Sequence, residues 1–373
     1  MKSIFVTAFA ALCISCSTEV RLTVENPSEF PRYEVVEISW EEITSRLANA
    51  TPENIVVKDS DGSQVPSQVI YHGGEIPVSL IFRSGAEAKK STRYSLATGL
   101  RENYPVKAYG RYVPERMDDY AWENDKMAYR LYGPALTEPD TPGIDVWCKK
   151  TEDMVIDRWY AAGDYHKDTG EGMDCYKVGE TLGCGGSTPV YNGRLVMSGK
   201  YITYKTLDNG PVRTSFELTY GPYVAGGVEV HSTKVISLDA GDLFNKITDT
   251  YYGNFESLPV AAGIVKHDLT GGFMDETFPL VGIMEWASDS QQPQEDGLIA
   301  LAVIMQGGRP TMDLENHAAI VKDLKPGVPS TYWAGATWSK KRGGMEFPKE
   351  WEVVVKSAAI RLLAEEPLKV TFK

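Results

Sequence analysis

Residues 165–179, YHKDTGEGMDCYKVG, hold the side chains of this chain that are best suited to chemistry. The stretch carries one imidazole, two phenols, three carboxylates and three glycines, and it has no apolar period. Its acid/base candidates are His166, Asp168, Glu171 and Asp174. Side chains of these types serve general acid/base catalysis or hard metal ions, and glycines let a backbone fold tightly around them. The stretch therefore predicts a site, with a solvated acidic loop as the alternative.

A second polar cluster lies upstream at residues 115–124, ERMDDYAWEN. Charged and amide groups alternate there with tryptophan, a mixture typical of sugar recognition, because polar groups bind hydroxyls or a carboxylate while an aromatic face covers the ring. Both clusters are too polar to be buried without a partner, so we expect them to line one cleft. The candidates from this region are Arg116, Trp122, Glu123 and Asn124, followed by Tyr132, Trp147 and Lys149.

Three further candidates for substrate binding lie downstream. Arg213 lies in the segment NGPVRTSFELTY, and Trp338 lies in the aromatic segment YWAGATWS. His267, in IVKHD, follows an apolar run, an arrangement that places a side chain at the end of a strand. A surface histidine is the alternative for His267.

The residues leave several chemistries open. A glycoside hydrolase would use two carboxylates on either side of a glycosidic bond, and a mutarotase or epimerase would use His166 or His267 with a glutamate. A glycan-binding protein without catalysis would need the aromatic and amide groups but no titratable histidine, so His166 favours an enzyme. The carboxylates available for a hydrolase pair are Asp118, Asp119, Glu123, Asp168, Glu171 and Asp174.

No metal is required by these patterns. Ca²⁺ on Asp168, Glu171 and Asp174 is an option, although their spacing matches no EF-hand loop. Zinc through His166 and His267 is disfavoured, because neither residue lies in an HxxxH or HxH arrangement.

The charge of the chain limits its partners. Its 373 residues carry a formal net charge of -13 at pH 7. Binding to nucleic acid or to an anionic membrane surface draws on an excess of lysine and arginine, so both are excluded as partners. A local basic pocket for an anionic substrate remains compatible with the acidic total.

The N-terminal residues 1–16 are expected to be a signal peptide of the bacterial lipoprotein type. Lys2 precedes an apolar run too short to span a bilayer, and the run ends in LCISC, where Cys16 is the expected lipid attachment site. An ordinary secretory signal is the alternative. A lipid anchor would be the only link to a membrane and would hold the protein in the cell envelope of a Gram-negative bacterium. Cys148, Cys175 and Cys184 are expected to be small core thiols.

Strand periodicity without βαβ alternation predicts a mainly β protein. Residues 20–100 contain short alternating strands separated by turns such as DSDGS, and they predict a small β-sandwich. Residues 107–373 continue with longer strands and predict a large antiparallel sandwich or supersandwich that holds the site. EWEVVVKSAAIRLL, residues 350–363, is taken as the last of these strands.

The chain resembles the bacterial family called domain of unknown function 4861. The resemblance rests on ERMDDYAWEND, YRLYGPAL, GIDVWCK, YHKDTGEGMDCYKVGETLGCGG and NGPVRTSFELTY, with GIVKHD and YWAGATWS later, and covers nearly all of the mature chain. The order of a small sandwich and a large sheet domain is also similar to galactose-mutarotase-like supersandwiches.

The family resemblance implies a role in polysaccharide degradation, beside enzymes that process glycans containing uronic acid. It implies removal of water from the non-reducing uronate of an oligosaccharide, by abstraction of the C5 proton and elimination at C4. Under that reading His166 would transfer the proton and Arg116 would neutralise the substrate carboxylate. Tyr165 or Tyr176 would be the partner acid or base, and Asp168 would orient the imidazole.

Overall fold

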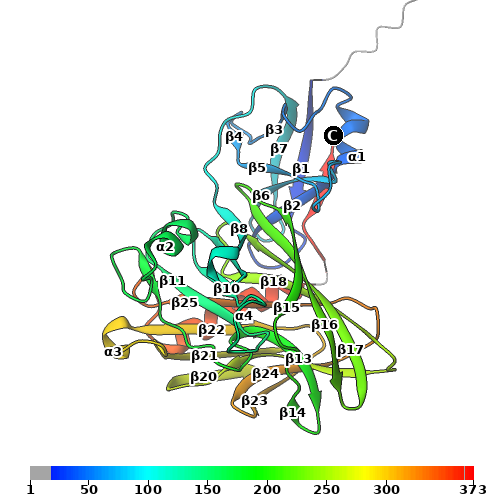
Figure 1. The fold of residues 1–373 in the computed structure, drawn as a ribbon. Helices are drawn as coiled ribbons and strands as arrows, with labels where there is room; N and C mark the ends of the chain where they lie inside the picture. The colour runs from blue at the N-terminus through cyan, green and yellow to red at the C-terminus, as the bar shows by residue number, and fades with distance from the viewer. Residues whose placement is uncertain (1–17, 365) are drawn as a thin grey trace, which may run out of the picture. The chain divides into compact units, whose positions relative to one another are not determined.

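The computed structural model describes residues 18–364 and 366–373, so the expected signal peptide and Cys16 lie outside the described residues. The fold is mainly β and its strands pair antiparallel, which confirms the predicted class. The chain divides into two compact units (Figure 1). Unit 1 comprises residues 18–69, 77–103 and 368–373, and unit 2 comprises residues 70–76 and 104–367.

Unit 1 contains a five-stranded and a three-stranded sheet. Their inner faces share a core in which the Phe82 ring packs edge-on against Tyr94, with centroids 5.0 Å apart. The five-stranded sheet has the order β26 (Lys369–Phe372), β1 (Glu19–Glu25), β7 (Ser91–Thr98), β3 (Ile55–Lys58) and β4 (Gln64–Val65). The three-stranded sheet has the order β2 (Arg32–Ser39), β6 (Ser79–Ala86) and β5 (Ser67–Ile70), and the helix α1 (Trp40–Arg46) follows β2.

The C-terminal strand β26 belongs to unit 1. It pairs antiparallel with β1, with Leu22 opposite Phe372 and Val24 opposite Val370. The expected large domain ran to residue 373, and this boundary is wrong for residues 368–373. The physical reason is that β26 provides backbone partners for β1, which would otherwise be an open edge of the sheet.

Unit 2 is built from three antiparallel sheets whose side chains join one apolar cluster. The eight-stranded sheet has the order β15 (Tyr201–Asp208), β16 (Arg213–Ala225), β17 (Val228–Asp239), β18 (Phe244–Gly253), β25 (Ser330–Trp338), β22 (Leu298–Ile304), β21 (Leu280–Trp286) and β20 (Leu269–Asp275). One five-stranded sheet has the order β14 (Arg194–Leu195), β13 (Cys184–Tyr191), β19 (Leu258–Val265), β24 (His317–Leu324) and β23 (Arg309–Leu314). The other, called the site sheet below, has the order β12 (Gly172–Asp174), β11 (Ile144–Lys149), β10 (Ala128–Leu131), β9 (Asp119–Asn124) and β8 (Ala108–Val113).

The eight-stranded sheet is covered on both faces, as the alternation of β22 shows. Ile299 and Leu301 join the cluster shared by the three sheets, whereas Leu298 and Ala300 join a second cluster on the opposite face. Because successive strand residues point to opposite faces, a strand covered on both sides is apolar throughout. The second cluster is covered by the helix α4 (Pro348–Leu362).

The prediction of a strand at residues 350–363 is therefore wrong. Trp351, Val355 and Ala359 recur every four residues and are all buried, which places them on one face of α4. Pro348 occupies the first turn, and the Glu350 carboxylate accepts a hydrogen bond from the Phe347 N–H at 3.1 Å. These start signals outweigh the β-propensity of the valines between Trp351 and Val355.

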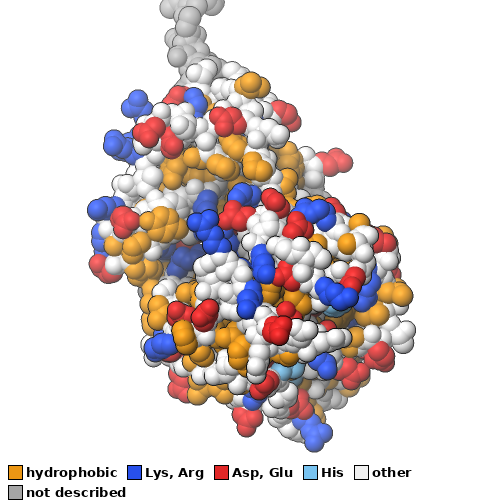
Figure 2. Space-filling model, turned by 90° about the vertical axis from the view of Figure 1, so that its left-hand side faces the viewer, with side chains coloured by type: hydrophobic (Ala, Val, Ile, Leu, Met, Phe, Trp, Pro, Cys, Tyr) orange, Lys and Arg blue, Asp and Glu red, His pale blue; other side chains and the backbone are white. Residues whose placement is uncertain are grey.

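The three cysteines of unit 2 are buried thiols, which confirms the expectation for Cys148, Cys175 and Cys184. Within residues 18–364 and 366–373, the helices lack the combination of length and apolar composition that a membrane span requires. On the face shown in Figure 2, acidic and basic side chains are interspersed.

His317 at the start of β24 makes the stability of unit 2 depend on pH. Its ring is buried, and Nε2 accepts the Leu182 N–H at 3.2 Å. Burial lowers the pKa of His317 to about 4. Between pH 6.5 and pH 4 the imidazole of His317 is protonated in the unfolded chain but stays neutral in the folded chain. The contribution of neutral His317 to the free energy of unfolding is therefore present above pH 6.5 and is lost as the pH falls toward 4.

We expect the free energy of unfolding to lose about 3 kcal/mol from this residue between pH 6.5 and pH 4. The measurement is chemical denaturation across that window for the wild type and for His317→Gln, which cannot take up the proton. The variant should show the shallower pH dependence, and equal slopes would contradict the assignment.

Candidate functional site

The site sheet carries charged side chains on one face and apolar side chains on the other. Along β9, Tyr120 and Trp122 join the main apolar cluster, whereas the alternate residues Asp119, Ala121 and Glu123 face the opposite side. That opposite face is covered by the helix α2 (Ile156–Ala162) and the segment after it, which pack against Trp147. The charged residues on it, all buried, are Asp119, Glu123, Arg130, Asp145, Lys149 and Asp174.

Arg130 is the centre of this charged face. Its Nε and Nη2 both donate to Oδ2 of Asp145, the first at 2.9 Å and the second at 2.5 Å. Nη2 also donates to Oδ2 of Asp174 at 3.0 Å, and Nη1 donates to the Tyr165 hydroxyl at 2.9 Å. One guanidinium thus holds two carboxylates and a phenol, and fixes their positions from three segments of the chain.

The two carboxylates beside Arg130 carry more negative charge than the guanidinium neutralises. Burial raises the pKa of Asp174 well above its usual range, and the charge of Asp145 raises it further. Burial opposes the charge of Arg130, but Asp145 and Asp174 hold its pKa well above the usual value. The arrangement therefore favours a charged Arg130 and a protonated Asp174, which can donate a proton.

A pocket of about 530 Å³ opens beside Asp174. It has the size of a small-molecule site and contains groups of both signs. Its lining residues are Arg116, Arg130, Tyr132, Glu138, Pro139, His166, Asp174, Tyr176, Lys177, Val178, Gly179, Glu180 and Asp289. The structure thus brings together Arg116, Tyr132, His166, Asp174 and Tyr176 of the candidates from the sequence.

Three buried polar atoms of pocket residues lack a hydrogen-bond partner among the described residues: Arg116 Nη1, Asp174 Oδ1 and the Tyr176 hydroxyl. Buried polar groups are nearly always paired, and an unpaired one costs about 1–3 kcal/mol. Three of them around one pocket leave hydrogen-bonding capacity that water or a polar ligand can fill.

His166 has the geometry of a base at the rim of the pocket. Its side chain is half exposed, and Nδ1 lies 3.2 Å from the carbonyl oxygen of Asp174. A carbonyl oxygen can only accept, so Nδ1 carries the hydrogen and the lone pair of a neutral ring lies on Nε2.

The expected partner of His166 was Asp168, and this assignment is wrong. The Asp168 carboxylate pairs with the Lys150 ammonium and accepts the backbone N–H groups of Gly170 and Gly172. These contacts hold it in its own turn, and the carboxylate beside His166 belongs to Asp174, with Nδ1 to Oδ2 at 3.8 Å.

The two tyrosines predicted as acid or base have different surroundings. Tyr165 is buried against the Trp147 ring, and its hydroxyl accepts a hydrogen bond from Nη1 of Arg130. Tyr165 therefore helps to hold Arg130 in position and is not assigned a proton transfer. Tyr176 lines the pocket, and burial, with the charge of Glu285 adding, raises its pKa well above the usual range. Its hydroxyl stays protonated and acts as a hydrogen-bond donor.

Several predicted ligand-binding residues are structural instead. The Trp122 Nε1–H donates to Asn245 at 2.7 Å, and the Asn124 amide bonds two backbone carbonyls at 2.7 Å. Glu123 pairs with Lys149 at 2.6 Å and accepts the Val155 N–H. The prediction that these residues line the pocket is wrong because both faces of β9 are covered.

The remaining aromatic candidates are also buried. Trp147 lies under Arg130, with the guanidinium carbon 5.2 Å from the ring centroid, and stacks on Trp159. Trp338 is 1% exposed and donates its Nε1–H to the Asp296 carbonyl at 2.8 Å. Neither ring is available to cover a sugar.

Arg213, Glu171 and His267 do not line the pocket. Arg213 forms a bidentate ion pair with Asp239, in which Nε and Nη2 donate to the two carboxylate oxygens at 2.6 and 2.9 Å. Glu171 forms an ion pair with Arg158 at 2.7 Å. His267 lies behind the pocket, where its Nδ1 is 2.8 Å from the buried Glu285 and its ring stands perpendicular to Tyr176.

Asp168, Glu171 and Asp174 do not converge as a Ca²⁺ site would require. Each is engaged by a different cation: Asp168 by Lys150, Glu171 by Arg158, and Asp174 by Arg130. Within residues 18–364 and 366–373, side chains of metal-ligating types do not gather in groups of three or more.

Gly133 allows close packing of the turn that carries Arg116. Arg116 ends the short helix η1 (Pro114–Arg116), and the following Met117 and Asp118 both adopt positive φ. A Cβ on Gly133 would lie 1.9 Å from the Asp118 carbonyl oxygen. The backbone of the turn can therefore approach position 133 this closely only because that residue is a glycine.

Gly133→Ala is therefore expected to destabilise the fold by about 1–3 kcal/mol, because the methyl group must displace backbone. The measurement is the denaturant midpoint. The control is Gly99→Ala, where the new methyl group meets no atom within 4 Å. A midpoint unchanged for Gly133→Ala would show that the turn has room to move.

Sequence reasoning missed Arg130, Asp145 and Asp289. Arg130 and Asp145 lie in the strands AYRL and IDVWCK, where each interrupts a run of apolar residues. That interruption was the available signal, because a charge placed between buried residues needs a partner of opposite sign. Asp289 lies far along the chain in a loop and gave no signal.

Comparison with known proteins agrees with the family expected from the motifs. A domain of unknown function, DUF4861, matches residues 24–370. A protein of Formosa agariphila named uncharacterized protein P7 is 30% identical over 406 residues, which cover 99% of this chain and 98% of that protein.

A solved structure shows a similar fold. It is a protein in the glycosyl hydrolase family 38 from Enterococcus faecalis, with a TM-score of 0.54 at 9% sequence identity over 95% of this chain. The present chain covers 47% of that protein, about half its length, and the likeness is one of fold alone. With a family match over residues 24–370, this chain belongs to the DUF4861 family.

Proposed function

We propose that the protein is a carbohydrate-active enzyme that removes water from the non-reducing uronate of an oligosaccharide. The observation that carries the proposal is the pocket itself, where a base, a neutral acid, a cation and a phenol meet around unpaired buried polar atoms. The fold likeness to a glycosyl hydrolase family 38 protein supports the sugar class. The uronate is the substrate that the family resemblance implies, and it is part of the proposal.

Arg116 is the group for the substrate carboxylate. Its Nη1 is buried without a hydrogen-bond partner, and Asp119 is 3.9 Å away, too far for a hydrogen bond. Lys177, on the same pocket, is exposed and adds a positive charge to those of Arg116 and Arg130. Neutralising the carboxylate makes the adjacent C5 proton more acidic, because the charge that develops as the proton leaves is then stabilised.

His166 and Asp174 are suited to the two proton transfers. His166 Nε2 removes the C5 proton, the C4–O bond breaks as the C4=C5 double bond forms, and Asp174 gives its proton to the leaving hydroxyl, which departs as water. The high pKa of Tyr176 makes it a poor proton donor in this step, so its hydroxyl is assigned to a hydrogen bond with the sugar. The proposed roles thus replace Asp168 and Tyr165 with Asp174.

The direct test is to incubate the purified protein with oligosaccharides that end in a non-reducing uronate. We expect ultraviolet absorbance of a conjugated ene-uronate and a product lighter by one water. New reducing ends without that absorbance would identify a hydrolase, and bound but unchanged substrate would identify a glycan-binding protein. Either result would overturn the dehydratase.

Arg116→Ala is expected to lower kcat/KM by about 10²-fold or more, because it removes a charged hydrogen bond that strengthens in the transition state. The matched control is Arg158→Ala, an arginine in an exposed pair outside the pocket. Equal activity of the two variants would remove Arg116 from the site.

The place of the enzyme in the cell is part of the same proposal. A lipid on Cys16 would hold it in the cell envelope, where oligosaccharides from polysaccharide degradation arrive.

A further inference from the structure

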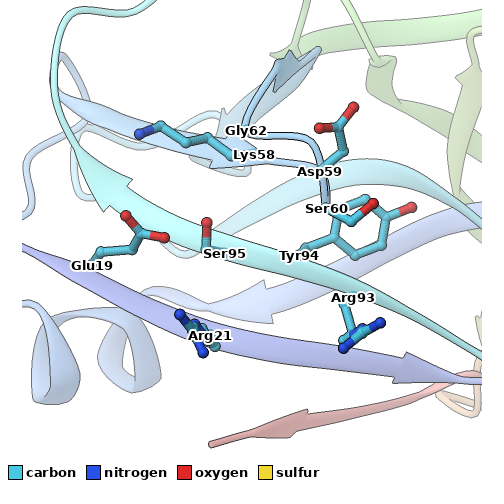
Figure 3. Close-up of a pocket in the computed structure, with 9 residues that line it drawn as sticks. All are labelled: Glu19, Arg21, Lys58, Asp59, Ser60, Gly62, Arg93, Tyr94 and Ser95. Atoms are coloured by element: carbon cyan, nitrogen blue, oxygen red, sulfur yellow. The ribbon is translucent and has the colours of Figure 1, made fainter.

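Unit 1 has a polar hollow on the outward face of its five-stranded sheet. The hollow has a volume of about 400 Å³, and its lining comes from β1, β3, β7 and the turn after β3 (Figure 3). Along β1, Leu22 and Val24 are buried in the core of unit 1, so Glu19 and Arg21, which belong to the alternate set of residues, point outward toward the hollow. All of its lining residues belong to unit 1.

Three cationic side chains surround Ser95 in this hollow. Arg21 on β1 and Lys58 on β3 both pair in register with Ser95 on β7. Arg93 lies two residues before Ser95 on the same face. Neighbouring strands are about 4.8 Å apart, so the three side chains start within about 10 Å of one another. Figure 3 shows the small Ser95 between Arg21 and Lys58.

The three cations lack ion-pair partners. The side chains of Arg21, Lys58 and Arg93 make no ion pair with any residue in the described part of the chain. The nearby carboxylate of Asp59 is occupied in its own turn, where it accepts the N–H groups of Asp61 and Ser63 at 3.0 Å. Glu19 and Asp59 also line the hollow, so its lining carries three positive and two negative formal charges. The excess positive charge, with three cations on neighbouring strands, can attract an anionic ligand.

We propose that this hollow is a second binding site, which takes an acidic glycan. A carboxylate or sulfate group would lie among Arg21, Lys58 and Arg93, and the hydroxyls of Ser60 and Ser95 would bond the hydroxyls of the sugar. The lining holds no leucine, isoleucine, phenylalanine or tryptophan. Side chains of those types insert into a lipid surface, so the composition favours a glycan over a membrane.

Binding is measured with the full chain carrying Arg116→Ala, so that the pocket of unit 2 contributes little. Isothermal titration uses three probes: an oligogalacturonate, a sulfated oligosaccharide and a neutral malto-oligosaccharide. We expect an acidic probe to bind, more weakly as salt rises, and the neutral probe to bind at least about tenfold more weakly. Adding Arg21→Gln and Arg93→Gln should weaken binding of the acidic probe about tenfold or more.

The matched control is Lys90→Gln, which removes an exposed cation of unit 1 outside the hollow and should leave binding unchanged. Absence of binding by both acidic probes, equal binding of the neutral probe, or no effect of the double substitution would overturn the site. Binding to phosphatidylglycerol vesicles without binding to either acidic probe would assign the face to a membrane. The dehydration reaction enters none of these readouts, so the two proposals fail separately.

Discussion

Replacing His166 by alanine is expected to lower turnover by about 10²- to 10⁴-fold, the usual contribution of a general acid or base, while the fold remains intact. The side chain is half exposed at the rim of the pocket, so its removal leaves no cavity in the core. Its Nδ1–H is held by the Asp174 carbonyl, which fixes Nε2 as the base. The measurement is the initial rate of ene-uronate formation.

The matched control for His166 is His231→Ala. His231 is an exposed histidine of unit 2 that stacks on Tyr252 at 5.1 Å, and it does not line the pocket. Its removal should leave the rate unchanged. Wild-type turnover by a folded His166→Ala variant would refute the assigned role and direct the search for a base to His267, behind Tyr176.

Arg130→Met is expected to destabilise the protein by about 3–5 kcal/mol, because it leaves the buried carboxyl groups of Asp145 and Asp174 without their cation. Methionine fills much of the same volume, so the loss of charge and hydrogen bonds dominates. The measurement is the free energy of unfolding in denaturant.

A second substitution separates charge from packing at this position. Adding Asp145→Asn to Arg130→Met should recover part of the lost stability, because one uncompensated charge is removed. Arg309→Met, in a pair exposed to solvent, should change stability little. A loss for Arg130→Met no larger than that of Arg309→Met would show that the network does not hold the site sheet together.

The strands were largely predictable because their signal is local. Alternation over a few residues marks β2 and β17 directly in the sequence. Residues 350–363 were misread because valines favour strands, whereas the repeat of Trp351, Val355 and Ala359 is visible only when a helix is assumed. The pairing of β26 with β1 joins residues from opposite ends of the chain, and no local pattern encodes such a pairing.

The site was predictable in part, for a different reason. His166 and Arg116 could be named because polar residues without an apolar period are rarely structural, and both line the pocket. Trp122 and Glu123 lie in a segment of the same polar and aromatic composition, but both are buried because both faces of β9 are covered. The sequence does not show that α2 covers the outer face of this strand. Burial is decided by segments remote in sequence, so residue type alone could not separate ligand contacts from supports.

The position of β26 has a consequence for the order in which this protein is made. Its residues 369–372 complete the sheet that begins at Glu19, so the first unit to leave the ribosome is the last to be finished. Until residues 369–372 have been made, β1 has an open edge that can pair with another chain. Unit 2 is complete in sequence by then and can fold first. A chain truncated before residue 368 would carry an intact pocket on a protein prone to aggregate.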